Sequence, residues 1–590
     1  MPSSASHRPG ARAAEARLIG GILGFWLLAW ALLTASAWVA GGRPTAVPVA
    51  LIDPTTIAAH ARGDHGLVLW HLVAAYGPIV QPVFWLVLGV GSVLTLCGVI
   101  AAVQARTAIA TWLRHRAGAV RHPRRTGDWA RAHELHGLRT RRIRPGAFVL
   151  GLHGRTPLMT QPETSVLVVG PTRSGKTSSL VVPNLFAWRG PAVVTSTKSE
   201  LVDITAAHRQ SAGPVYVYDP TGEVGGRYQT VTWSPLANCD SLDHAWRVAA
   251  WLCAGLQQGS GRGDNDWAHW AESGKLLIAP LMYAAAVAGR SIVDVQMWIH
   301  GFDVATPLSI LEDALFDPSS THSDDAARGV AMLTSVDQRP EKERGTVFST
   351  VTRIFSVFNE QPVAASAAWN RFEPADFLAR AGTLYLCTPR QSPERVSSLF
   401  VGLLMSVVTA AYGIADASQS GRLDRELGLF LDELANIVPV EDLPALASQG
   451  AGRGVVLMSI VQDLSQLRAR YGADKAHSIL NNHTCKVVLP GVGDPETTDV
   501  LSRLIGQRSF TDVQVNRGAD GRVSRSYAAR LEPLATPDAL RQLHEGTAVV
   551  LYRGRPAAVI RTRPWFADRT MRRLAQLRYV RNAEEVRRAA

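Results

Sequence analysis

A short glycine-containing segment has the residue types and spacing of a phosphate-binding loop. Gly170 to Thr177 reads G-P-T-R-S-G-K-T, which matches G-x-x-x-x-G-K-[ST]. Glycines at both ends allow the backbone to curl so that its N–H groups face phosphate oxygens, while Lys176 reaches the β- and γ-phosphates. The Thr177 hydroxyl is then expected to ligate Mg²⁺. The residues predicted to bind ATP are Gly170, Pro171, Thr172, Arg173, Ser174, Gly175, Lys176, Thr177 and Ser178.

A separate segment supplies the carboxylates that ATP hydrolysis requires in addition to a phosphate-binding loop. The apolar run 427–431 ends in Asp432 and Glu433. Asp432 is predicted to hold Mg²⁺ together with Thr177, and Glu433 to polarise the hydrolytic water. A strand that ends at a solvated Asp-Glu turn is common by itself, so the interpretation depends on the phosphate-binding loop being present as well.

Two further side chains are candidates for catalysis. Gln462 follows the expected strand 455–461, where an amide can sense the γ-phosphate and orient water. A solvated strand cap is the alternative. Arg453 precedes the same strand and could reach the nucleotide of a neighbouring subunit as an arginine finger, although an ordinary surface arginine fits the pattern equally well.

The elements around these motifs predict a parallel α/β fold. The segment 165–169 is an apolar strand directly before the glycine-containing loop, and a helical pattern follows the loop. Further strands alternate with helical stretches, which is typical of a mainly parallel sheet covered by helices on both faces. The expected strands are 165–169, 192–195, 215–218, 382–387, 427–431, 455–461 and 485–489.

Length and composition limit the class of protein. With 590 residues there is room for about four domain-sized units. A charged fraction of 19% and a hydrophobic fraction of 47% exclude a mostly disordered chain and suit a globular body with a smaller membrane part. The net charge of +12 favours anionic partners, either nucleic acid or a phospholipid surface. Five dispersed cysteines without metal-ligand spacing indicate neither a disulfide framework nor a zinc site.

The N-terminal region predicts a two-helix membrane anchor. The uncharged segments 18–40 and 83–103 are each long enough to span a bilayer. Arginines precede the first span and follow the second, so both termini are expected in the cytoplasm, with a short external loop between the spans. A cleaved signal peptide is the alternative for the first segment, because Ala35-Ser36-Ala37 resembles a cleavage site.

Five parts are expected along the chain. Residues 1–105 form the anchor, and 106–150 form a basic neck that contacts either lipid headgroups or DNA. Residues 151–237 and 376–565 form the nucleotide-binding domain, interrupted by an all-helical insertion at 238–375. Residues 566–590 are expected to form a basic, solvated C-terminal tail.

Several of these motifs together resemble a known family. GPTRSGKTSSLVVPNLFAW, the segment 194–201 (VTSTKSEL), WSPL at 233–236, FLDELANI and GRGVVLMSIVQDLSQL occur in the order typical of the conjugative coupling proteins of type IV secretion systems, the TraG-like family. Ser196 and Ser199 depart from that family's pattern, which often has Asp and Gly there, while Lys198 and Arg209 match it. The sequence is similar to the family over nearly its whole length.

The resemblance implies a fold and a function. It implies a RecA-like P-loop ATPase, anchored as a multi-pass protein in the inner membrane and assembled as a homo-hexamer. The implied partners are a relaxase or other protein substrate, the secretion channel, and DNA bound without regard to sequence, which is expected to be single-stranded. The function would be ATP-driven conjugative DNA transfer. The alternative is a receptor ATPase that recruits secreted proteins. A septal DNA pump is disfavoured, because no long linker or small DNA-reading domain is evident.

Overall fold

The computed structural model describes residues 128–580 except 198, 223, 225–226, 257–263, 318–320, 388–392 and 518–522. Side chains at 238, 255–256, 264–269, 393–394, 510–517 and 523–529 are also not described. The predicted membrane spans, the first part of the neck and the last ten residues lie outside the described residues. Within them, one helix is long and apolar enough to cross a membrane, α16 (Ser397–Ala417). Most of α16 is buried in the protein core, as expected for the core helix of a globular domain.

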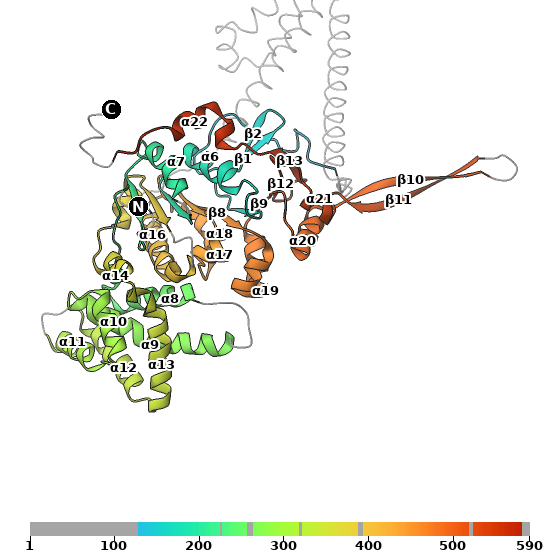
Figure 1. The fold of residues 1–590 in the computed structure, drawn as a ribbon. Coiled ribbons are helices and arrows are strands. Elements are labelled where there is room, and N and C mark those ends of the chain that lie inside the picture. The colour runs from blue at the N-terminus through green and yellow to red at the C-terminus, as the bar shows by residue number, and fades with distance from the viewer. Residues whose placement is uncertain are drawn as a thin grey trace, which may run out of the picture. The chain divides into compact units, whose positions relative to one another are not determined.

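The centre of the fold is an eleven-stranded sheet (Figure 1). Seven consecutive strands of it are parallel, in the order β9-β3-β8-β7-β4-β6-β5. All seven coincide with predicted strands, so the prediction of an α/β fold with a mainly parallel sheet is confirmed. Their bounds are β3 (Val166–Val169), β4 (Ala192–Ser196), β5 (Val215–Tyr218), β6 (Thr383–Cys387), β7 (Leu427–Leu431), β8 (Val455–Val461) and β9 (Cys485–Val488).

These strands are nearly continuous runs of Val, Leu and Ile because both faces of the sheet are covered. Alternate side chains enter two separate apolar clusters: Leu167 and Val169 of β3 belong to one, Val166 and Val168 to the other. Helices α6 (Val182–Ala187) and α7 (Glu200–Arg209) cover the second cluster. The first cluster is covered by α16, α18 (Leu443–Arg453), α19 (Leu464–Asn482) and α20 (Pro495–Ile505).

Four antiparallel strands extend the sheet beyond β9, which the sequence did not predict. They are β12 (Thr547–Tyr552), β13 (Ala558–Arg561), β1 (Val149–His153) and β2 (Thr156–Met159). A separate hairpin, β10 (Gln507–Arg517) with β11 (Val523–Pro533), forms a two-stranded sheet of its own. The sheet is therefore mixed, with its parallel part in the centre.

Residues 128–148, the described part of the predicted basic neck, pack on this antiparallel extension. The backbone N–H of Ala130 donates to the carbonyl of Ala557 over 2.7 Å. Leu135 and Leu138 are buried in the cluster beneath α6 and α7. Arg555 donates to the carbonyl oxygens of Glu134 and His136, at 2.7 Å each. The predicted contact of the neck with lipid headgroups or DNA stays a prediction, while these leucines attach its described part to the sheet.

The described residues of the predicted insertion, 238–375, contain helices and no strand. The first of them, α8 (Leu242–Leu256), packs on α16 of the sheet domain and on α9 (Asp264–Val287), and its apolar residues are continuous with the core cluster under α16 (Figure 1). The remaining helices are α10 (Ile292–His300), α11 (Ala305–Phe316), α12 (Ser323–Asp337), α13 (Glu341–Phe355), α14 (Gln361–Ala368) and α15 (Pro374–Ala379).

Candidate nucleotide-binding site

The glycine-containing loop makes a tight turn at the carboxyl end of β3. The N–H of Gly170 donates to the carbonyl of Val461 on the neighbouring β8, over 3.1 Å. A Cβ at position 170 would lie 2.7 Å from Ser174 Oγ and 2.9 Å from Leu489 Cβ, so the close packing of this turn favours glycine. Gly175 has φ +90°, a conformation that favours glycine, and Arg173 adopts φ +66°. The backbone therefore curls as a phosphate-binding loop requires.

A helix begins directly after the loop. Residues Thr177–Val181 form a π-turn (η1) that continues into α6, and the N–H of Ser179 donates to the carbonyl of Gly175 over 2.9 Å. Lys176 is buried, at 8% exposure, at the start of this helix. The free N–H groups and the positive end of the helix dipole therefore lie beside the lysine, which is the arrangement that binds phosphate.

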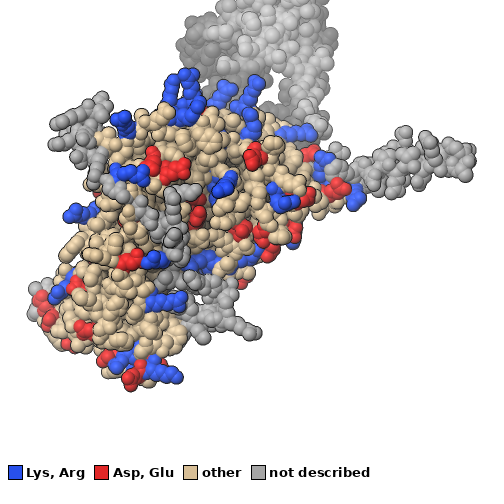
Figure 2. All heavy atoms as spheres, viewed as in Figure 1, with Lys and Arg blue, Asp and Glu red and all other residues tan. Residues whose placement is uncertain are grey.

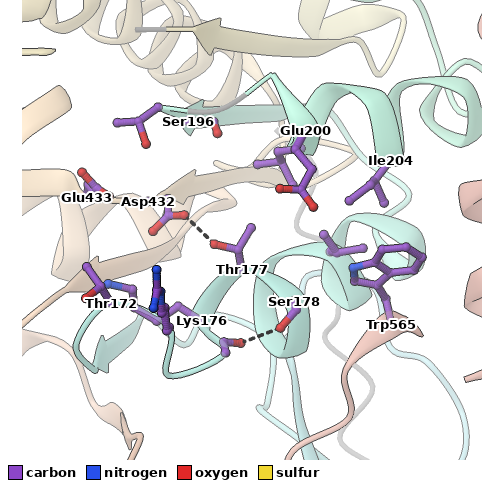
Figure 3. Close-up of a pocket in the computed structure, with 15 residues that line it drawn as sticks. Thr172, Lys176, Thr177, Ser178, Ser196, Glu200, Ile204, Asp432, Glu433 and Trp565 are labelled. Atoms are coloured by element: carbon purple, nitrogen blue, oxygen red, sulfur yellow. Dashed lines mark hydrogen bonds between the residues drawn. The ribbon is translucent and has the colours of Figure 1, made fainter. Parts of the chain in front are cut away.

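The two acidic residues, Asp432 and Glu433, line the same pocket as the loop. Thr177 Oγ1 donates to Asp432 Oδ2 over 2.9 Å, although the two residues are 255 positions apart in sequence (Figure 3). Thr195, on the adjacent strand β4, donates its hydroxyl to the carbonyl of Asp432 over 2.8 Å and so holds the end of β7. Glu433 follows in a left-handed conformation, φ +52°, and begins the short helix α17 (Leu434–Ile437).

These groups surround a pocket of about 370 Å³, a size typical of small-molecule sites. Figure 3 shows Lys176, Thr172, Asp432 and Glu433 at one end of it and Ile204 and Trp565 at the other. Of the predicted nucleotide-binding residues, Gly170, Pro171 and Ser174 shape the loop without lining the pocket. The residues that line it are Thr172, Arg173, Gly175, Lys176, Thr177, Ser178, Val182, Ser196, Thr197, Glu200, Leu201, Ile204, Asp432, Glu433 and Trp565.

Sequence reasoning missed the second end of the pocket. Glu200, Leu201 and Ile204 come from α7, which the sequence marked only as a segment with family resemblance. Trp565 comes from the last part of the chain, at the boundary of the predicted tail. No local motif indicates that this tryptophan lines the same pocket as the loop, because the arrangement arises only from tertiary packing.

Gln462 lies next to the loop but does not line the pocket. It directly follows β8, which is placed between β3 and β7. Its backbone N–H donates to Gln466 Oε1 over 3.1 Å, and Gln466 Nε2 donates to Asn436 Oδ1 over 3.1 Å. Because Asn436 belongs to α17, this chain of amides connects the end of β8 to the helix that follows Glu433.

Arg453 lies at the opposite end of the parallel strands from the loop of its own chain. It is the last residue of α18, just before β8 begins. Its Nε donates to Asp416 Oδ1 over 2.7 Å, and its guanidinium lies 4.9 Å from the ring centroid of Tyr412. The side chain is one-third exposed. Within one chain, therefore, Arg453 is distant from the nucleotide pocket.

A buried histidine, His483, follows the end of α19 and forms a hydrogen bond with β8. His483 Nδ1 lies 2.8 Å from the carbonyl oxygen of Ile479, so Nδ1 carries the proton and donates. Its Nε2 then accepts from the hydroxyl of Ser459, also at 2.8 Å. Complete burial lowers the pKa of His483 from 6.5 to about 4. The folded protein therefore keeps this histidine neutral.

This burial predicts a loss of stability in mild acid. Below pH 6.5 the unfolded chain binds a proton at His483. The folded chain binds this proton only when the pH falls to about 4. The contribution is complete above pH 6.5 and falls by up to about 3 kcal/mol as the pH approaches 4. We expect His483→Gln to show a smaller acid-induced decrease in melting temperature than the unsubstituted protein. His477→Gln, at an exposed position on the same helix, is the matched control; equal acid sensitivity in all three proteins would contradict the assignment.

The fold and site together define a class of protein. A parallel α/β sheet carries a glycine-containing loop with a buried lysine after one strand, and an aspartate bonded to the loop threonine after another. These are the features of the P-loop nucleotide-binding proteins. Residues 130–586 match the family described as type IV secretory system conjugative DNA transfer. The chain therefore belongs to that family.

Individual relatives agree with this assignment. The conjugal transfer protein TraG of Escherichia coli is 27% identical over 400 residues, which cover 63% of this chain and 60% of that protein. Protein VirD4 of Agrobacterium fabrum is 24% identical over 431 residues, covering 69% and 59%. The matches thus span about three-fifths of the length of these curated relatives.

Solved structures share the fold. The bacterial conjugative coupling protein TrwBdeltaN70 has a TM-score of 0.53 and 17% identity, with 74% of this chain and 92% of that chain covered. A TrwB structure in complex with ADP and Mg²⁺ has a TM-score of 0.52 and 17% identity, with 74% and 93% covered. At this level of identity the likeness establishes the architecture only.

Proposed function

We propose that this protein is an ATP-hydrolysing coupling protein, anchored in the inner membrane, that links a relaxase–DNA substrate to a type IV secretion channel and drives conjugative DNA transfer. The observation that carries the proposal is the Thr177–Asp432 contact inside the P-loop pocket of a chain that belongs to the conjugative DNA transfer family. The names of TraG and of the plasmid coupling protein TrwB point the same way.

The residues at the phosphate end fit ATP with Mg²⁺. Magnesium prefers oxygen ligands and binds nucleotides through one or two protein oxygens plus the phosphates. Thr177 and Asp432 supply these protein oxygens, and in the described part of the chain no group of three metal-ligating side chains competes for the ion. Bound Mg²⁺ would supply charge neutralisation at the β- and γ-phosphates. Lys176 would contact the same phosphate oxygens from the loop.

Hydrolysis needs an oriented water near the γ-phosphate. Glu433 lines the pocket next to Asp432 and is the proposed base that polarises this water. Gln462, beside the loop, is proposed to help orient the water or report the γ-phosphate through Gln466 and α17. Arg453 is proposed to act only across a subunit boundary of a homo-hexamer, since its own pocket lies at the other end of the strands.

The charge distribution supports membrane anchoring more directly than DNA binding. Residues 1–127 contain eleven arginines, no lysine and three acidic residues, so they carry +8 of the formal charge of +12. Nine of these arginines precede the first predicted span or follow the second, where the positive-inside rule places them in the cytoplasm, while Arg43 and Arg62 lie in the predicted external loop. Figure 2 shows Lys and Arg gathered along the upper edge of the described part and interspersed with Asp and Glu over the rest of the visible face. DNA would therefore be held by local phosphate contacts rather than by a strong overall field.

DNA stimulation of ATP hydrolysis tests this function. We expect single-stranded DNA to raise the ATPase rate of the full-length protein in detergent several-fold at low salt, regardless of DNA sequence. The stimulation should disappear in high salt, because phosphate contacts weaken as salt rises. Lys176→Ala should abolish hydrolysis with and without DNA. A Lys176-dependent ATPase that ignores every DNA but responds to a secreted protein would instead support the receptor function.

A further inference from the structure

The end of the pocket away from the phosphates is mainly apolar and aromatic, with Glu200 as its one carboxylate. Val182 of α6, Leu201 and Ile204 of α7, and Trp565 line it. Figure 3 shows Trp565 and Ile204 close together, with Thr177 and Ser178 between them and the Lys176 end. In a nucleoside triphosphate the apolar, aromatic part is the base, and it lies at the end opposite the γ-phosphate. The two ends of the pocket therefore match the two ends of this ligand: the Lys176 end suits the phosphates, and the Trp565 end suits the base.

The position of Trp565 is fixed by the turn that carries it. Trp565 begins the 3₁₀ turn η5 (Trp565–Ala567), and the N–H of Ala567 donates to the carbonyl of Pro564 over 3.0 Å. Asp568 then caps α22 (Arg569–Ala575) by accepting from the N–H groups of Thr570 and Met571, at 2.9 and 3.0 Å. The same carboxylate forms an ion pair with Arg563, on the other side of the turn. The indole is thus held by a capped, closed turn.

The segment after the turn is bound to α7, the helix that lines the same end of the pocket. Tyr579 packs on Tyr228 with ring centroids 4.9 Å apart, and the Tyr228 hydroxyl donates to Asp203 within α7 over 2.5 Å. Gln210, at the end of α7, exchanges two hydrogen bonds with the backbone of Val580, at 2.7 and 3.1 Å. This differs from the solvated tail predicted for residues after 565. The tryptophan and α7 are therefore parts of one packed wall.

We propose that Trp565 is the base-binding platform of the nucleotide site, on which the purine ring of ATP or GTP stacks while the phosphates occupy the loop. This rests on the proposed ATP-binding function. Trp565 is partly buried and packs against the core beneath α7, but it also faces the pocket, as Figure 3 shows. Its neighbour Phe566 is 55% exposed and does not line the pocket. Stacking on an aromatic ring tolerates any base, so adenine and guanine should benefit alike.

Calorimetric titration of the full-length protein in detergent with Mg²⁺ tests this. ATP, GTP and inorganic tripolyphosphate, which has phosphates but no base, are the three probes. We expect Trp565→Leu to weaken ATP and GTP about tenfold and to leave tripolyphosphate unchanged, because only base stacking is lost. Trp565→Phe should keep most of the affinity for ATP. Phe566→Leu, the matched control, should bind all three probes like the unsubstituted protein.

Two outcomes would overturn the proposal. The first is unchanged ATP affinity in Trp565→Leu. The second is an equal loss for ATP and tripolyphosphate in that variant, which would mean that the tryptophan only supports the fold. Failure of the proposed function looks different: Lys176→Ala would then bind all three probes as tightly as the unsubstituted protein, whatever happens at position 565.

Discussion

Glu433→Gln is expected to reduce ATP turnover by about 10²–10⁴-fold, the range typical of removing a general base, while ATP affinity changes little. The amide has the same shape as the carboxylate but accepts no proton from the attacking water. Glu433 is suited to the role because it lines the pocket directly after Asp432, which contacts Thr177. Its left-handed backbone is held by the N–H groups of Asn436 and Ile437, which donate to its carbonyl over 2.9 and 3.0 Å.

The measurement is a steady-state ATPase rate together with an equilibrium affinity for ATP. Glu441→Gln removes the same charge from an exposed residue that pairs with Lys475, and it should leave both quantities unchanged. If Glu433→Gln retains a rate within a few-fold of the unsubstituted protein, the base lies elsewhere. Glu200, the remaining carboxylate that lines this pocket, would then be the residue to substitute.

The phosphate end of the site could be predicted because its parts are local. The loop identifies itself by spacing, and Asp432 follows a strand that consists only of apolar residues and glycine. In a parallel sheet the carboxyl ends of all strands meet at one edge, so the strand assignment places Thr177 and Asp432 at the same edge, while their contact depends on a strand order that the sequence did not predict. Arg453 shows the same rule in reverse: a residue that precedes a strand lies at the other edge.

The base end and the long-range pairing of the antiparallel strands could not be predicted for the same physical reason. β1 and β13 pair although they are about four hundred residues apart, and neither contains a turn signal that would indicate the partner. Trp565 lines the far end of the pocket, and the chain after it docks on α7 through two hydrogen bonds between Gln210 and the backbone of Val580, which no sequence pattern indicates. Such contacts depend on which surfaces are left uncovered once the central sheet has formed.

The buried side chain of Arg209 is expected to contribute strongly to the stability of the fold. It ends α7 and is fully buried. Its Nε donates to Thr383 Oγ1 and its Nη2 to the carbonyl of Gly190, both over 2.8 Å, while Nη1 donates to the carbonyl of Trp188. Burial lowers the pKa of Arg209 to about 10, so the guanidinium remains charged at neutral pH. The side chain joins α7, β6 and the loop after α6.

Arg209→Ala is expected to lower the free energy of unfolding by about 3–5 kcal/mol, because two buried carbonyl groups lose their donors and a cavity is left behind. Arg209→Lys should recover only part of this, since an ammonium group does not reproduce the planar fork that reaches three acceptors. Thermal unfolding of the full-length protein is the measurement. The control is Arg189→Ala, at an exposed position of the loop after α6. This substitution should change the free energy of unfolding by less than about 0.5 kcal/mol.

The same substitution tests whether the wall of the nucleotide pocket depends on this anchor. Leu201 and Ile204 reach the pocket from α7, whose last residue is Arg209. If the anchor positions α7, Arg209→Ala measured below its unfolding transition should weaken ATP more than tripolyphosphate, because the base end loosens while the loop after β3 stays in place. Equal loss for both ligands would show instead that Arg209 supports the sheet as a whole. If Arg209→Ala melts at the same temperature as Arg189→Ala, the buried hydrogen bonds of Arg209 do not contribute to stability as proposed.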